Sequence, residues 1–176
     1  MKLVILDRDG VVNYDSEHYI KSPEEWIPIP GSLEAIATLN RKGYTVTIAT
    51  NQSGIGRGFY NEMQLDAIHQ KMQTILKVHQ GRIDRVFYCP HLPTQACNCR
   101  KPAPGLLQQI AAHYQCDLNA VPFVGDSLRD IRAACAVGCQ PVLVRTGNGA
   151  AVESLLKEIA SHVWVYDDLA AFAESL

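Results

Sequence analysis

Two carboxylates one residue apart, Asp7 and Asp9, stand directly after an apolar run near the start of the chain. The run 3–6 is short and contains β-branched residues, which is typical of a buried strand. Such a strand brings its two acids to a loop, where they can hold a cation beside a nucleophile. The start of the chain therefore predicts a cation-dependent catalytic site.

More polar residues stand where later apolar runs end. They are Thr50, Asn51, Gln52 and Ser53 after the run 44–49, Asp126 and Asp130 after the run 121–124, and Arg100 and Lys101 just before a helix. In a parallel sheet, ligands bind beyond the carboxyl ends of the strands. We therefore expect one site that combines carboxylates, a hydroxyl group, an amide and a lysine.

Short β-branched runs alternate regularly with amphipathic segments. Strands are predicted over 3–6, 44–49, 83–88, 121–124, 141–144 and 163–166. Helices are predicted after a Ser32 cap, after an Asn61–Gln64 capping box, at Pro104, before Gly138, near 150–160 and over 168–175, with loops over 11–31 and 51–60. This alternation predicts an α/β fold, a Rossmann-like parallel sheet with helices on both faces. The gaps between motifs leave no room for a large cap domain.

Length and composition limit the possible functions. The chain has 176 residues, 47% of them hydrophobic and 19% charged, so a single domain over 1–176 is expected. The net charge of −2 argues against a nucleic-acid partner, and no run of about 18 apolar residues predicts a membrane span. Six cysteines without an export signal are expected to be thiols or metal ligands. We expect a cytoplasmic monomer that acts on a small molecule.

The clustered groups suit phosphoryl transfer through an aspartyl phosphate. Asp7 would attack phosphorus, and Asp9 would protonate the leaving oxygen and then activate water. A Mg²⁺ ion held by Asp7 and Asp126 would offset the repulsion between carboxylate and phosphate. Thr50 would hold the phosphoryl oxygens, and Lys101 would balance the negative charge of the transition state.

Together, these motifs resemble the haloacid dehalogenase superfamily of phosphatases. The motifs are Asp7-Arg8-Asp9-Gly10, Thr50-Asn51, Lys101-Pro102 and Gly125-Asp126-x-x-x-Asp130, in the superfamily's order over nearly the whole chain. The resemblance implies a Mg²⁺-dependent phosphoric monoester hydrolase with the roles given above. It also implies that the backbone carbonyl of Asp9 binds the metal, and Asp130 is expected to anchor Lys101.

A second group of metal-binding residues lies in one loop. Cys89, His91, Cys97 and Cys99 follow the pattern C-x-H-x5-C-x-C. Three thiolates and one imidazole form a common tetrahedral zinc site, and four protein ligands leave no open position for catalysis. We therefore expect a structural Zn²⁺ in this loop insertion. Because the loop ends at Lys101, the metal would fix the position of the catalytic lysine.

The zinc loop and the phosphatase motifs together are similar to a subgroup with two activities. One is removal of the 7-phosphate of D-glycero-D-manno-heptose 1,7-bisphosphate in the ADP-heptose pathway to the lipopolysaccharide core, and the other is hydrolysis of histidinol phosphate. Runs 51–58 and 144–147 resemble the heptose enzymes. The short gap between His91 and Cys97 is more like the histidinol enzymes, so both activities stay open.

Substrate contacts are expected from loops around the acids. The resemblance implies Asp15, His18, Tyr19, Ser53 and Arg100, and the predicted set adds Asn51, Gln52 and Arg57. Arg57 and Arg100 suit the second phosphate of a bisphosphate, as does Lys21. Asp15 or Glu17 could instead bind the amine of histidinol phosphate.

A phospho-aspartate receiver module is an alternative from another class of protein. It also places acids, a threonine and a lysine around Mg²⁺ in a parallel sheet. It lacks an acid two residues after the phosphorylated aspartate, the position that Asp9 holds here. A receiver would retain the phosphoryl group, whereas a phosphatase would release it.

Overall fold

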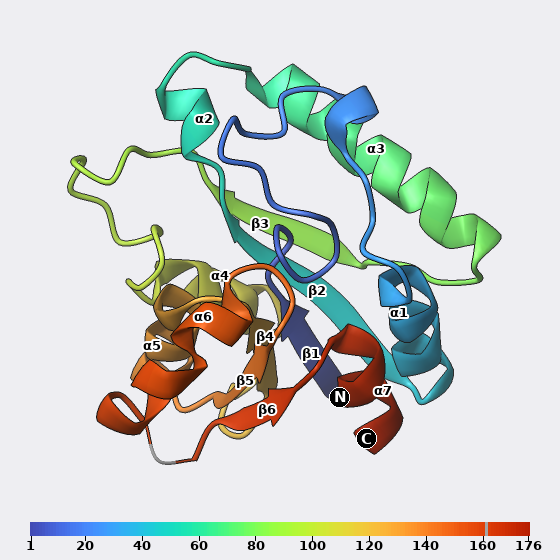
Figure 1. The fold of residues 1–176 in the computed structure, drawn as a ribbon, viewed down its shortest axis with the longest axis vertical. Coiled ribbons are helices and arrows are strands. Elements are labelled where there is room, and N and C mark those ends of the chain that lie inside the picture. Colours follow the sequence, from blue (N-terminus) through green and yellow to red (C-terminus); the bar gives the residue numbers. More distant parts are fainter. Residues whose placement is uncertain (161) are drawn as a thin grey trace.

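The computed structural model describes residues 1–160 and 162–176. It contains one parallel sheet of six strands in the order β3-β2-β1-β4-β5-β6 (Figure 1). The strands are β1 (Lys2–Leu6), β2 (Tyr44–Asn51), β3 (Arg85–Cys89), β4 (Pro122–Gly125), β5 (Gln140–Val144) and β6 (Trp164–Tyr166). The predicted α/β fold with a parallel sheet is confirmed, and each predicted strand lies within two residues of its observed bounds.

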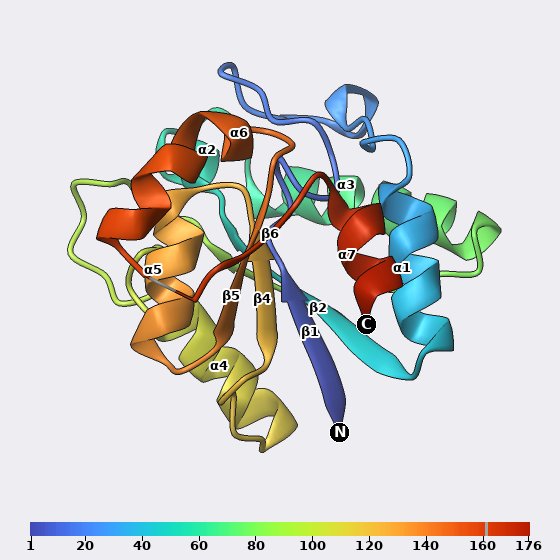
Figure 2. The ribbon, with the colours of Figure 1, turned by 60° about the horizontal axis from the view of Figure 1, so that its bottom comes forward.

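The helices cover both faces of the sheet (Figure 2). On one face lie α1 (Ser32–Arg41), α3 (Glu62–Val78) and α7 (Leu169–Ser175), and on the other lie α4 (Gly105–Tyr114) and α5 (Leu128–Ala136). The chain winds from β1 to the β3 edge and then returns to build β4, β5 and β6 on the other side of β1. Right-handed crossovers in these two opposite directions place their helices on opposite faces. The winding reverses between β1 and β4, where ligands bind in such folds.

Three segments that do not belong to the main layers differ from their predictions. A short helix, α2 (Ser53–Gly56), lies within the predicted loop 51–60, and a single 3₁₀ turn, η1 (Pro23–Glu25), lies within 11–31. The helix predicted near 150–160 is divided into α6 (Gly149–Val152) and a 3₁₀ segment, η2 (Glu153–Glu158). These helices are too short to show the periodicity on which sequence-based assignment depends.

The predicted Ser32 cap is wrong, whereas the Asn61–Gln64 capping box is confirmed. Gly31 is the N-cap of α1, with φ of 82°. Ser32 lies buried, and its hydroxyl donates to the carbonyl of Val12 at 2.6 Å. In the capping box of α3, each side chain bonds the other residue's backbone N–H at 2.9 Å. Ser32 therefore ties the loop after β1 to α1, a contact between distant segments that local sequence does not reveal.

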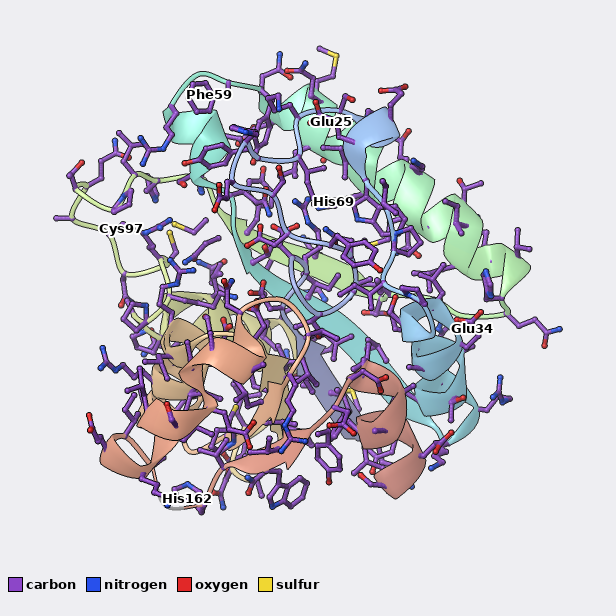
Figure 3. The ribbon with its side chains drawn as sticks, viewed as in Figure 1. Glu25, Glu34, Phe59, His69, Cys97 and His162 are labelled. Carbon is purple, nitrogen blue, oxygen red and sulfur yellow. The ribbon has the colours of Figure 1, made fainter. Side chains whose placement is uncertain are left out.

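Loops surround the carboxyl ends of the strands. Figure 3 labels Phe59 on the segment after α2 and Cys97 on the long loop after β3, both at the same end of the molecule. Among the described residues, the segments 7–31 and 90–104 contain no element longer than η1, so no large cap domain is present there. No described helix has the length and apolar character needed to cross a membrane.

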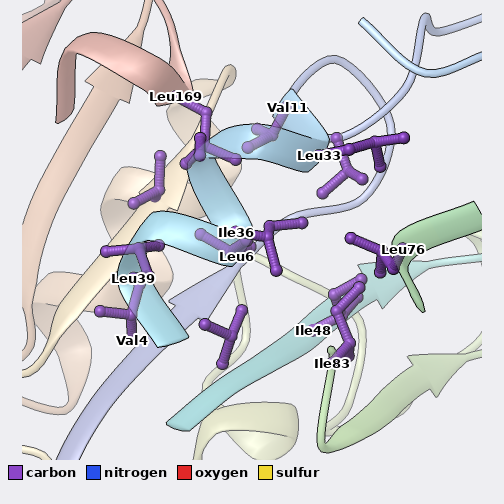
Figure 4. Close-up of a cluster of buried hydrophobic side chains, with 14 of the residues drawn as sticks. Val4, Leu6, Val11, Leu33, Ile36, Leu39, Ile48, Leu76, Ile83 and Leu169 are labelled. Carbon is purple, nitrogen blue, oxygen red and sulfur yellow. The ribbon is translucent and has the colours of Figure 1, made fainter. Parts of the chain in front are cut away.

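The main apolar core lies between β1, β2 and the helices of one face. Figure 4 shows its tightly grouped side chains, among them Leu6, Ile36, Ile48 and Leu76, all fully buried. A second cluster packs β1, β3 and β4 against α4 and α5. Burial of apolar side chains on both faces stabilises the sheet and holds the ends of β1, β2 and β4 in fixed positions.

Candidate active site

The ends of β1, β2 and β4 meet around a small cavity of about 80 Å³. Its lining is Asp7, Asp9, Asp15, Thr50, Asn51, Lys101, Asp126, Ser127, Arg129, Asp130 and Asn148. The strands pair here directly, since the backbone N–H of Asp7 donates to the carbonyl of Val124 at 2.8 Å. The structure thus brings together the residues predicted for the catalytic centre.

Lys101 is the buried cation of this cavity. Its ammonium group lies 2.9 Å from Asp7 and 2.7 Å from Asp130, and it donates to the carbonyl of Ala49 at 2.8 Å. All three N–H donors therefore have a partner, which a buried charge requires. The second oxygen of Asp130 accepts from the backbone and hydroxyl of Ser127 at 3.1 and 2.6 Å. Asp130 is occupied on both oxygens and so anchors the lysine.

Asn51 holds the backbone of Lys101. Its amide accepts from the Lys101 N–H at 3.0 Å and donates to the Lys101 carbonyl at 3.1 Å. Both halves of the amide are used within the protein. The structure therefore places Asn51, predicted as a substrate contact, where it orients the loop that presents the lysine.

Asp126 lies between two glycines that allow its close approach. A Cβ atom on Gly10 or Gly147 would stand 2.1 or 2.2 Å from an Asp126 oxygen, so neither position accepts a larger residue without displacement. Both glycines also have positive φ, 81° and 57°. The backbone and side-chain amides of Asn148 donate to Asp126 Oδ2 at 2.8 and 3.2 Å. These two hydrogen bonds from Asn148 restrain the orientation of the Asp126 carboxylate.

Burial and the clustering of carboxylates raise the pKa values of two acids in this cavity. Burial, with nearby carboxylates, raises the pKa of Asp7 to about 8, although Lys101 opposes that rise. Burial and the charge of Asp130 raise the pKa of Asp126 to about 6. These acids lose solvent and repel one another, which favours their neutral forms. A bound cation would reverse the effect, because it compensates both charges.

Asp9 is held by several donors at the opening of the small cavity. Arg8 contacts both of its oxygens, with Nε at 3.0 Å from Oδ1 and Nη2 at 3.1 Å from Oδ2. Asn13 donates to Oδ1 and Gln52 to Oδ2, each at 2.9 Å. Gln52 also donates to the buried hydroxyl of Thr50 at 3.0 Å. Gln52, which was predicted to contact substrate, therefore links Asp9 to Thr50 by hydrogen bonds.

A larger cavity of about 380 Å³ adjoins the first and shares Asp9, Asp15, Asn51 and Arg129 with it. Its lining includes six of the predicted substrate contacts besides Asn51, namely Asp15, Tyr19, Gln52, Ser53, Arg57 and Arg100. His18 is exposed and does not line either cavity. Burial raises the pKa of the Asp15 carboxyl, with repulsion from Asp9 as a second cause.

Three of the loops that line the larger cavity contact one another. The rings of Tyr19 and Phe59 lie 5.3 Å apart, and the guanidinium of Arg57 lies 5.9 Å from the Tyr19 ring. Gly56 donates its N–H to the carbonyl of Pro90 at 3.0 Å, which joins α2 to the loop after β3. The three loops therefore support one another around the larger cavity.

The predicted zinc ligands converge in the loop after β3. Ligand atoms of Cys89, His91, Cys97 and Cys99 all lie within 4.8 Å of one another. His91 Nδ1 is 3.4 Å from the Cys89 sulfur and 3.2 Å from the Cys99 sulfur. Without a metal, burial and the Cys99 thiol raise the pKa of Cys89 to about 12. The soft sulfur ligands and one imidazole fit a tetrahedral Zn²⁺.

A still larger groove of about 710 Å³ lies elsewhere, along η2 and β6. Glu153 and Lys157 are the charged residues of its lining, which otherwise consists mainly of aliphatic side chains. It offers no cluster of acids with a lysine. We therefore assign catalysis to the smaller cavities at the strand ends.

Sequence reasoning missed three residues of the site. Arg8 is 1% exposed and pairs with Asp9, Arg129 on α5 lines both cavities, and Asn148 bonds Asp126. Arg8 stands within the first motif, and Arg129 lies between Asp126 and Asp130, so their positions offered a signal. Asn148 follows β5, the next strand along the sheet, and the rule of strand ends could have identified it.

Comparisons with known proteins agree with this geometry. A family profile described as HAD-hydrolase-like matches residues 98–172. The chain is 53% identical to the D-glycero-beta-D-manno-heptose-1,7-bisphosphate 7-phosphatase of Pseudomonas putida, over 100% of this chain and 99% of that protein. It is 52% identical to the enzyme of the same name from Pseudomonas aeruginosa, over 99% and 97% of the two chains.

A solved structure is equally similar. The crystal structure of D,D-heptose 1,7-bisphosphate phosphatase from B. bronchiseptica, complexed with magnesium and phosphate, has a TM-score of 0.95 and 52% identity. The match covers 99% of this chain and 97% of that one. Full-length identity above one half, with the same fold, leaves no room for a receiver module. The chain therefore belongs to the haloacid dehalogenase superfamily of phosphatases, in the family of these heptose-bisphosphate phosphatases.

Proposed function

We propose that this protein removes the 7-phosphate of D-glycero-D-manno-heptose 1,7-bisphosphate. The observation that carries the proposal is the cluster of Asp7, Asp126 and Lys101 at the strand ends, in a chain 53% identical to a protein named for that activity. The related crystal structure contains magnesium and phosphate, the cofactor and product that such a reaction requires. The reaction would serve the ADP-heptose pathway to the lipopolysaccharide core.

In the proposed mechanism, Asp7 attacks the phosphorus while Asp9 gives a proton to the leaving sugar oxygen. The resulting aspartyl phosphate is hydrolysed when Asp9 takes a proton from water. Thr50, from β2, would bind a phosphoryl oxygen. Lys101 balances the negative charge of the transition state and keeps Asp7 oriented, since it already contacts that carboxylate at 2.9 Å.

Asp7 and Asp126 would hold Mg²⁺ with the backbone carbonyl of Asp9. The donors are all oxygen atoms, which Mg²⁺ prefers. The ion supplies charge neutralisation between the carboxylate nucleophile and the phosphate. Asp130 is also close, but both of its oxygens are bonded to Lys101 and Ser127, so we leave it out of the metal site.

We expect Mg²⁺ to bind more tightly as pH rises from 6 to 8. In the metal-free protein the pKa of Asp7 is raised to about 8 and that of Asp126 to about 6, so at pH 6 the ion must displace protons. Each displaced proton changes the affinity by up to about tenfold per pH unit. Calorimetric titration at pH 6, 7 and 8 measures the change. Equal affinity at pH 6 and 8 would contradict it.

The raised pKa values of Asp7 and Asp126 also make the stability of the metal-free fold depend on pH. An acid whose pKa is raised by folding holds its proton in the folded state after the unfolded chain has lost it. The contribution of Asp7 and Asp126 to the free energy of unfolding therefore decreases as the pH rises from about 4 to about 8. Added Mg²⁺ should raise the melting temperature more at pH 8 than at pH 6, with ionic strength held constant.

The larger cavity supports a bisphosphate over histidinol phosphate. Arg57, Arg100 and Arg129 line it and can pair with a second phosphate group. Asp15 and Glu17 also line it, and they would suit the amine of histidinol phosphate or the hydroxyl groups of a sugar. With Arg8 and Asp9 included, the lining has four arginines and three acids, and this cationic excess and the names of the relatives together favour the heptose bisphosphate.

A side-by-side assay of phosphate release tests this assignment. With Mg²⁺ present, we expect kcat/KM for heptose bisphosphate to exceed that for histidinol phosphate by at least about 100-fold, since each charge-assisted contact contributes about 1.5–3 kcal/mol. Arg129→Met should raise KM for the bisphosphate. Arg132→Met is the matched control, because Arg132 lies on the same helix and lines neither cavity. Faster turnover of histidinol phosphate would reverse the assignment.

We further propose that Cys89, His91, Cys97 and Cys99 hold a structural Zn²⁺. The loop joins the site at both ends, because Cys89 ends β3 and Lys101 comes two residues after Cys99. Its backbone also bonds the N-cap residue of α2, since the Gln52 N–H donates to the Cys89 carbonyl at 2.8 Å. The metal would therefore stabilise the lysine and the substrate loops without entering the reaction.

Metal analysis should find about one equivalent of zinc in protein purified without chelator. Cys97→Ser should lower that content and reduce thermal stability, because a ligand is lost. Cys135→Ser is the matched control, since Cys135 is an exposed thiol outside the cluster and should leave zinc unchanged. The proposal fails if the native protein contains no zinc.

Four broader expectations are also proposed. The protein acts as a single domain over 1–176 and as a monomer, with a small sugar phosphate and no nucleic acid as its partner. The reaction prepares a precursor for nucleotide activation of a sugar, so we place it in the cytoplasm. Light scattering of the purified protein checks the proposed monomer.

A further inference from the structure

Arg8 is a buried cation that the proposed reaction does not use directly. It is among the largest fully buried side chains and is 1% exposed, although it contributes to the lining of the larger cavity beside Asp9. Burying a guanidinium is costly unless its donors are paired. Its partners are the Asp9 carboxylate on one side and two neutral groups, Gln52 and His69, on the other.

The guanidinium of Arg8 contacts both carboxylate oxygens of Asp9. Nε lies 3.0 Å from Asp9 Oδ1, and Nη2 lies 2.9 Å from Oδ1 and 3.1 Å from Oδ2, so one guanidinium contacts both oxygens and restrains the direction of the carboxylate. Asp9 lines both cavities, so its carboxylate stands where the leaving oxygen and the attacking water must pass. The Asp9 side chain stays 20% exposed despite these contacts, which leaves it able to exchange a proton with ligands.

Arg8 is in turn supported from α3 and from Gln52, the residue that follows β2. Its Nη1 lies 3.3 Å from His69 Nε2, and its Nη2 donates to Gln52 Oε1 at 3.1 Å. Burial and the neighbouring Arg8 charge lower the pKa of His69 to about 3, so the ring is neutral and Nε2 accepts from Arg8. Tyr60 donates to the same Gln52 oxygen at 2.6 Å. Figure 3 shows His69 on the inner side of α3, toward the loop after β1.

We propose that Arg8 is a positioning residue for the acid–base steps, held by His69 and Gln52 so that it keeps the Asp9 carboxylate aimed at the reacting oxygens. The inference rests on the proposed function, because it assumes an aspartyl phosphate on Asp7. General acid–base catalysis is sensitive to placement and contributes about 10²–10⁴-fold. Loss of Arg8 should therefore lower kcat by about 100-fold while KM changes little.

The test compares Arg8→Met, Asp9→Asn and the double variant with p-nitrophenyl phosphate. This ester has a good leaving group, so Asp7 can be phosphorylated without an acid, whereas hydrolysis still needs a base. We expect Arg8→Met to release a burst of about one equivalent of p-nitrophenol and then turn over slowly. Because Arg8 acts through Asp9, the double variant should be no slower than Asp9→Asn.

Arg145→Met is the matched control. Arg145 makes a bidentate contact with Glu153, at 2.7 and 2.8 Å, but on the surface. The Arg145→Met variant should therefore show normal turnover and no burst. Circular dichroism and zinc content report whether Arg8→Met is folded. If it is not, Arg8→Lys is measured in its place, because lysine retains the positive charge but lacks the planar guanidinium. The kcat of this variant should fall by about tenfold.

Two outcomes separate this inference from the proposed function. If Asp9→Asn retains full activity, the acid–base assignment itself is wrong. If Asp9→Asn is impaired but Arg8→Met multiplies that loss in the double variant, Arg8 acts independently of Asp9 and the positioning role is overturned. Full kcat in folded Arg8→Met or Arg8→Lys overturns it as well.

Discussion

Asp7→Asn is expected to abolish phosphate release, with a loss of about 10⁴-fold or more. An amide cannot form the acyl phosphate, so the reaction loses its covalent intermediate. The amide has nearly the same shape, and it relieves the repulsion among buried acids that raises the pKa of Asp7 to about 8. The folded structure should therefore survive. Rapid-quench assays with labelled substrate measure both turnover and phosphorylated protein.

Asp117→Asn is the control for this substitution. Asp117 is exposed and bonds only the nearby backbone N–H of Asn119 among the contacts of the described residues, so its activity should equal that of the unaltered protein. Circular dichroism shows whether Asp7→Asn is folded. Substantial turnover in folded Asp7→Asn, or a phosphoryl group trapped on another residue, would remove Asp7 as the nucleophile.

Lys101→Met should have the second-largest effect, on both stability and activity. Removal of the ammonium leaves Asp7 and Asp130 buried without their shared cation, and breaking such a pair costs about 3–5 kcal/mol. Turnover should fall by about 10²–10³-fold, because the transition-state charge loses its partner. Denaturant unfolding of metal-free protein gives the stability change. The loss should be larger at pH 8 than at pH 5, where the acids can take up protons.

A second substitution separates the two effects. Lys101→Met with Asp130→Asn removes one of the uncompensated carboxylates, so part of the lost stability should return. Activity should stay low, since the charge opposite the phosphate is still missing. Recovery of turnover together with stability would show that Lys101 acts only by holding the structure together.

The motif residues were predictable because their roles depend on their positions at strand ends. The apolar run before Asp7 and the run before Asp126 identify two parallel strands, and the strand-end rule then brings the acids together. The zinc ligands were equally visible, since four sulfur and nitrogen donors within eleven residues form a cluster whatever the surrounding fold is.

Contacts between distant segments were not predictable in the same way. Asn51 and Gln52 looked like substrate contacts because they follow a strand, yet one bonds the Lys101 backbone and the other joins Thr50 to Asp9. Ser32 looked like a helix cap but instead bonds Val12. Each of these polar groups has a partner whose identity depends on packing.

The α/β architecture, the acids at the strand ends, the lysine and the thiol cluster could be predicted from the sequence, because period and spacing are local properties. Which polar groups face ligand and which support another residue depends instead on the packing of segments that are distant in the chain. Arg8 is an example, since a guanidinium next to two acids suggests a surface charge, whereas the fold buries it to 1% exposure and gives each of its three nitrogens a protein partner.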